Sequence, residues 1–118
     1  MIPSPKYNNW EARFQSELHQ AEMARALGNE GKARVCARRA AGIAISEYLR
    51  RRDISPPGSS AYNILKFFQS NLEVPNDARG IAGHFLERVD TNYTLPSDVD
   101  LIQDARWLAQ KLLLQNQS

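Results

Sequence analysis

Cysteine is nearly absent from this 118-residue chain, which contains only Cys36. A single cysteine excludes an internal disulfide and a cysteine-based zinc cluster. Because Cys36 lies in a helical segment rich in small residues, we predict a buried, unreactive thiol. A strong net charge is also missing. The formal value of +2 argues against a polycation that binds nucleic acid through its overall charge.

Long apolar runs are missing as well. Residues 1–5 have no apolar core of a secretory signal, and no run approaches the roughly 20 residues that a membrane-spanning helix needs. We therefore expect a cytoplasmic protein that makes no membrane contact. The length suits one domain with one hydrophobic core. We predict that residues 9–114 form this domain, with a flexible N-terminus at 1–8 and a frayed tail at 115–118.

The sequence lacks the common catalytic and phosphate-binding motifs. Glycine-rich phosphate loops, GxSxG and HExxH do not occur. The two histidines, His19 and His84, lie far apart in the chain, and we expect neither a metal nor a cofactor. Asp98, Asp100 and Asp104 are better interpreted as residues that stabilise the positive end of the last helix than as metal ligands.

Apolar residues recur at helical spacing along the whole chain, and no alternating pattern indicates a strand. The periodicity predicts helices at about 9–27, 30–52, 61 onward, 75–89 and 97 onward. Expected N-terminal caps are Asn8 or Asn9 for the first helix, Asn29 for the second, and Ser97 with Asp100 for the last. The predicted fold is all-α: an antiparallel up-and-down bundle of four to five helices.

The second predicted helix has one face made of small residues, namely Ala33, Ala37, Ala40, Ala41 and Ala44. Small side chains let neighbouring helices approach closely, so we expect this helix at the centre of the bundle.

Three arginines lie on other faces of the same helix. Arg34 and Arg38 are one turn apart, and Arg39 is about 100° further round. They could bind a phosphate group, or they could solvate the outer side of a buried helix; the sequence leaves both interpretations open.

Arg79 and His84 are the candidate catalytic pair. Arginine can hold a phosphate with two hydrogen bonds, and an imidazole can act as acid or base on a ribose hydroxyl. Five positions of a helix turn through about 500°, so the two side chains project about 140° apart. They could therefore cooperate only at a helix start or across two subunits.

In their order and spacing, several segments resemble the HEPN family of small helical bundles. The first helix ends at residues 24–28, and an alanine-rich second helix covers residues 33–49. A polar loop then leads to residues 61–65, and residues 85–89 lead through 92–96 into the last helix.

The resemblance implies a bundle that is frequently dimeric and often accompanies a minimal nucleotidyltransferase. It also implies that some relatives are ribonucleases of toxin–antitoxin and defence systems, with an Arg-x(4–6)-His motif. Arg79 and His84 match that spacing, whereas Gly80 and Leu86 depart from the active pattern.

Three hypotheses follow from the sequence. In the first, the chain is a non-catalytic HEPN-like module, a homodimer that binds a partner protein or a nucleotide-type ligand through Arg34, Arg38 and Arg39. In the second, it is a metal-independent endoribonuclease in which Arg79 holds the phosphate and His84 transfers protons. In the third, it is a purely structural helical scaffold.

Overall fold

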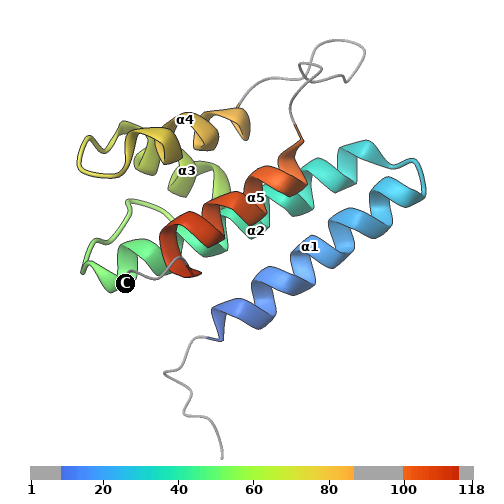
Figure 1. The fold of residues 1–118 in the computed structure, drawn as a ribbon, viewed down its shortest axis with the longest axis horizontal. Helices are drawn as coiled ribbons and strands as arrows, with labels where there is room; N and C mark the ends of the chain where they lie inside the picture. Colours follow the sequence, from blue (N-terminus) through green and yellow to red (C-terminus); the bar gives the residue numbers. More distant parts are fainter. Residues whose placement is uncertain (1–8, 87–99, 115–118) are drawn as a thin grey trace, which may run out of the picture.

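The computed structural model describes residues 9–86 and 100–114 (Figure 1). Within these residues every regular element is a helix and no strand occurs, so the predicted all-α class is confirmed. The elements are α1 (Trp10–Ala26), α2 (Glu30–Arg51), α3 (Ala61–Ser70), α4 (Asn76–His84), α5 (Leu101–Ala109) and a closing π-helical turn, η1 (Gln110–Leu114). The segments predicted as a flexible N-terminus and a frayed tail lie outside the described residues.

Helix α2 is the centre of the fold. It packs against α1, α3 and α5, while α3 and α4 also pack against each other (Figure 1). Its five face-forming alanines are fully buried, and Cys36 is buried beside them. The central position predicted from the small residues is therefore confirmed. Larger side chains complete the core around α2: Phe14, Leu18, Ile45, Leu49, Leu65, Phe68, Phe85 and Leu108.

The turn between α1 and α2 follows the predicted signals. Gly28 has a left-handed backbone (φ 81°), and the Asn29 N–H donates to the Ala24 carbonyl at 2.8 Å. This pattern is a Schellman motif, which requires a residue without a side-chain clash at the position of Gly28. The side chain of Asn29 then caps α2 by accepting a hydrogen bond from the Lys32 N–H at 3.1 Å.

Three helix ends differ from the prediction. Asn9 precedes α1 but makes no side-chain cap, because its backbone is left-handed (φ 52°) rather than in the extended region that capping residues adopt. Helix α4 ends at His84 rather than near 89. Gly80 and Gly83 lower the helix propensity of its last two turns. Helix α5 begins at Leu101 rather than near 97, and Ser97 and Asp98 lie outside the described residues.

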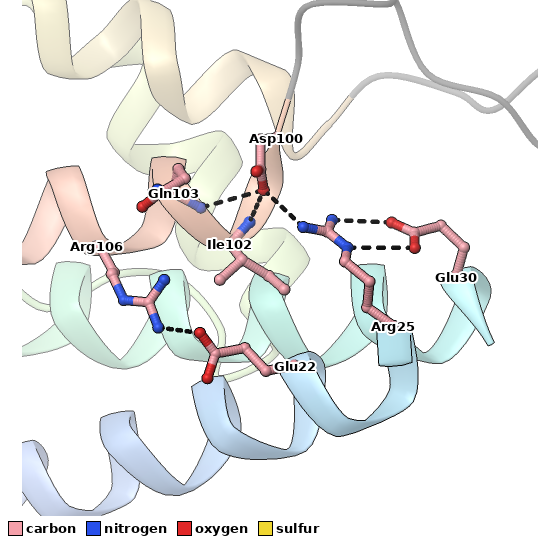
Figure 2. A network of polar contacts seen from close by, with 7 residues as sticks. All are labelled: Glu22, Arg25, Glu30, Asp100, Ile102, Gln103 and Arg106. Atoms are coloured by element: carbon pink, nitrogen blue, oxygen red, sulfur yellow. Dashed lines mark hydrogen bonds and ion pairs between the residues drawn. The ribbon is translucent and has the colours of Figure 1, made fainter. Parts of the chain in front are cut away.

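Asp100 is the cap of α5. One of its carboxylate oxygens accepts from the backbone N–H groups of Ile102 at 3.1 Å and Gln103 at 3.3 Å. The same oxygen accepts from Arg25 at 3.1 Å, and Arg25 also pairs with Glu30 at 2.9 Å (Figure 2). One guanidinium thus joins the end of α1 to the starts of α2 and α5.

A separate ion pair, between Arg106 and Glu22, also joins α5 to α1 (Figure 2). None of the described helices is both long enough and apolar enough to span a membrane.

Candidate functional site

Arg79 and His84, the predicted catalytic pair, contact different helices. The Arg79 Nε–H donates to the Gln69 carbonyl at 2.9 Å, and its Nη1 donates to the Asn76 side chain at 3.3 Å. Gln69 lies near the end of α3, so Arg79 fastens α4 to α3.

His84 contacts α5 instead. Its Nδ1 lies 2.7 Å from an Oδ2 oxygen of Asp104, in the first turn of that helix. Among the described residues, no hydrogen bond joins Arg79 to His84. The separation agrees with the angle of about 140° that helical geometry gives for five positions.

Arg38 contacts the turn directly after His84. Its Nε–H donates at 3.3 Å to the backbone carbonyl of Phe85, the residue directly after His84. Arg38 comes from α2, His84 from α4 and Asp104 from α5. These three residues, which we call the α4-end cluster, hold the end of α4 against α2 and α5, and each belongs to a different group of candidate residues in the sequence.

Arg34 extends this face of α2 by one turn. Its Nε atom is buried and has no hydrogen-bond acceptor among the described residues. Leaving a buried donor unsatisfied costs about 1–3 kcal/mol, and more for a charged group. A guanidinium has donors only, so the group that would satisfy it must be an acceptor, such as an anion.

The contact with Asp104 fixes the chemistry of the His84 ring. The Asp104 side chain is only 16% exposed, and an ionised carboxylate can only accept hydrogen bonds. Nδ1–H therefore donates to Asp104, and Nε2 is the ring nitrogen that is left for a ligand. Because the His84 side chain is 34% exposed, a ligand can reach it.

Arg39 lies away from the α4-end cluster. It lines a cleft between α1 and α2 that also contains Arg13. The three arginines predicted as one ligand-binding surface are thus divided, with Arg34 and Arg38 on one side and Arg39 on the other. The offset of about 100° between consecutive helical residues accounts for this division.

Two displaced pKa values belong to the ion-pair network of Figure 2. Burial raises the pKa of Asp100, but hydrogen bonds from Arg25 and from the backbone of Gln103 and Ile102 outweigh it and hold that pKa below 3.8. The hydrogen bond to Glu30 is the largest cause of a raised pKa at Arg25, reinforced by Asp100 and opposed by burial. Both displacements stabilise the charged forms, which suits a structural network.

Asp104 is the member of the α4-end cluster that sequence reasoning assigned differently. It was interpreted through the helix dipole, and its position in the first turn of α5 is compatible with that role. Its pairing with His84 depends on how α4 packs on α5, for which the sequence carries no local signal. Within residues 9–86 and 100–114, no group of three or more histidine, cysteine or acidic side chains is placed to hold a metal ion.

Comparisons with known proteins give no relative: no family model, no curated protein and no solved structure matches the chain.

Proposed function

We propose that this chain is a non-catalytic helical module that binds a phosphate-bearing ligand, a nucleotide or a short RNA, at the α4-end cluster. The observation that carries the proposal is the hydrogen bond from Arg38, on α2, to the backbone carbonyl of Phe85, the residue directly after His84 of α4. Arginine supplies directed donors to phosphate oxygens, and a histidine adds a further donor when protonated.

Arg34 supports the same ligand chemistry. It lies one turn from Arg38 on α2, and its buried Nε has no acceptor among the described residues. An anion bound beside α2 would supply that acceptor. Two guanidinium groups against the single carboxylate of Asp104 leave the site with a positive balance, which favours a phosphate over a neutral ligand.

The HEPN-type ribonuclease is the enzymatic alternative at this place. The hydrogen bond between Asp104 and Nδ1 of His84 favours it, because it leaves Nε2 of the neutral ring able to take a proton from a ribose hydroxyl. In this version Arg38, rather than Arg79, would hold the scissile phosphate, since Arg79 is bonded to α3. A homodimer and a nucleotidyltransferase partner, both implied by the HEPN resemblance, remain predictions.

A binding experiment tests the proposal. Fluorescence anisotropy with a labelled single-stranded RNA, and titration calorimetry with AMP and ATP, should give saturable binding to the wild-type chain. Arg38→Gln should weaken it by about tenfold, equivalent to ~1.4 kcal/mol. Arg39→Gln is the matched control, since it removes the same group one residue further along, and it should leave the affinity unchanged.

Arg34→Gln provides a second variant that breaks no side-chain hydrogen bond to another described residue at its buried Nε, so it remains informative if Arg38→Gln unfolds. Absence of binding to the folded wild-type chain, or equal weakening by Arg38→Gln and Arg39→Gln, would overturn the proposal. RNA cleavage that disappears in His84→Ala would replace it with the ribonuclease alternative. A scaffold would show neither binding nor cleavage.

A further inference from the structure

A cleft of about 250 Å³ lies between α1, α2 and the start of α3, lined by residues that the α4-end cluster does not use. Its lining combines charged, hydroxyl and apolar side chains, among them Arg13, Glu17, Arg39, Ile43, Ser46 and Ile64. Arg13 and Glu17 are one turn apart on α1, whereas Arg39, Ile43 and Ser46 follow one another along α2.

The cleft is set by a close approach of two helices at Gly42. A methyl group at this position would lie 3.0 Å from the Cβ of Ala61 and 3.2 Å from its Cα. The first residue of α3 therefore rests almost directly on the backbone of α2. Gly42 and Ala61 both line the cleft, and neither side chain fills it.

Glu17 contributes to the cleft a buried carboxylate oxygen that has no hydrogen-bond donor among the described residues. The oxygen is Oε1, and Arg13 lies one turn before Glu17 on α1. A buried carboxylate oxygen requires a donor. A ligand that carries an ammonium or amine group would supply one.

The two arginines of the cleft complete a pattern of both charge signs. Within the described part of the chain, the guanidinium groups of Arg13 and Arg39 form no ion pair. Either guanidinium can therefore bind a carboxylate by donating two hydrogen bonds to it. The isoleucine side chains of Ile43 and Ile64 offer an apolar wall between these polar groups.

The lining restricts the class of ligand. An acid, two arginines and an apolar wall share one open cleft, so its lining matches a small molecule that carries an ammonium group, a carboxylate and an apolar side chain. We propose that this cleft binds an α-amino acid with an apolar side chain, with its ammonium group on Glu17 and its carboxylate on Arg39 and Arg13.

Three related probes separate the two polar contacts. L-leucine carries both charges, leucinamide keeps the ammonium group and loses the carboxylate, and 4-methylpentanoate keeps the carboxylate and loses the ammonium group. Backbone-amide NMR of the full chain shows where each probe binds as well as how tightly. We expect L-leucine to shift signals of cleft residues saturably, and each of the two analogues to bind more weakly.

Variants that remove one charge at a time assign the contacts. Glu17→Gln should weaken L-leucine by about tenfold and leave 4-methylpentanoate unchanged. Arg39→Gln should weaken both of these and leave leucinamide unchanged. Arg38→Gln, on the other side of α2, is the control and should alter none, which also separates this cleft from the phosphate site proposed above.

Any of three results would overturn the inference. The first is the absence of cleft shifts with L-leucine, valine, isoleucine and methionine in the folded wild-type chain. The second is an unchanged L-leucine affinity in Glu17→Gln. The third is a set of cleft shifts produced by AMP but by no amino acid, which would transfer the cleft to the phosphate ligand.

Discussion

His84 and Asp104, 20 residues apart in the chain, join the end of α4 to the first turn of α5 through a contact of 2.7 Å between Nδ1 and Oδ2. Past the other end of α5, Lys111 of η1 forms an ion pair at 3.2 Å with Asp77 in the first turn of α4. The helices therefore run antiparallel and are fastened at both ends. Because Arg38 also donates to the turn after His84, the α4-end cluster has a structural role that does not depend on ligand binding.

That structural role predicts a modest stability effect for His84→Ala. Losing one partly buried hydrogen bond to a charged partner should lower the free energy of unfolding by about 1.5–3 kcal/mol. Urea denaturation monitored by circular dichroism measures the change. His19→Ala is the matched control, because His19 is exposed on α1, and it should have almost no effect. Equal stability of the two variants would show that the contact to Asp104 does not stabilise the fold.

Asp100 predicts a dependence of stability on pH. Its pKa in the folded chain lies below the ordinary 3.8, so its charged form is favoured by folding. The stabilisation is therefore fully present above about pH 4 and is lost as pH falls through the lower, folded-state pKa. Asp100→Asn keeps a good capping side chain but removes the ion pair with Arg25.

The difference in unfolding free energy between wild type and Asp100→Asn should thus be largest near neutral pH and shrink on acidification. At neutral pH this difference in unfolding free energy should stay below about 1 kcal/mol, because the Asp100 side chain is 46% exposed and water screens its ion pair with Arg25. Asp100→Ala should cost about 1 kcal/mol more, since it also removes the cap. A wild-type advantage over Asp100→Asn that persists unchanged in acid would contradict the role of the charge.

Gly42 and Gly80 predict opposite effects of the same substitution. Gly42→Ala places a methyl group 3.0 Å from Ala61, and overpacking of this kind costs about 1–3 kcal/mol. Gly80→Ala meets no atom within 4 Å in an exposed part of α4. It should stabilise the chain by about 0.5–1 kcal/mol, because alanine loses less backbone entropy in a helix. Thermal unfolding of both variants shows whether the signs differ as expected.

Local signals predicted most of the fold. The five alanines of α2 placed this helix at the centre, and Gly28 and Asn29 marked the turn before it. Both signals can be recognised from residues that are close together in the sequence. The start of α5 was placed too early because Ser97 and Asp100 are both good caps, and only the capping hydrogen bonds of Asp100 decide between them.

The candidate site was less predictable because its members come from separate helices. Arg38 and His84 were each identified from the sequence, but as parts of different sites. The hydrogen bond from Arg38 to the turn after His84, like the pairing of His84 with Asp104, depends on how the end of α4 packs on α2 and α5. The cleft was missed for the same reason, since Arg13 and Glu17 are an ordinary exposed-face pair on α1 until Arg39 and α3 are placed beside them.

The end of α2 carries a buried acid whose partners predict non-additive behaviour. The Glu47 side chain is only 3% exposed, yet it accepts from Arg50 at 2.7 Å and 2.9 Å and from Arg51 at 2.8 Å. Glu47→Gln removes the charge that both guanidinium groups share and should lower the free energy of unfolding by about 1–3 kcal/mol.

The two arginines are much more exposed than the acid, so either one can compensate for the loss of the other. Arg50→Ala and Arg51→Ala should each have a small effect, while the double variant should lose more stability than the sum of the two, because the buried carboxylate then loses both guanidinium partners at once. In Glu47→Gln the same double-mutant cycle should become nearly additive. Urea denaturation of the eight chains measures both cycles, and an additive cycle with Glu47 intact would mean that the acid does not depend on these arginines for its stability.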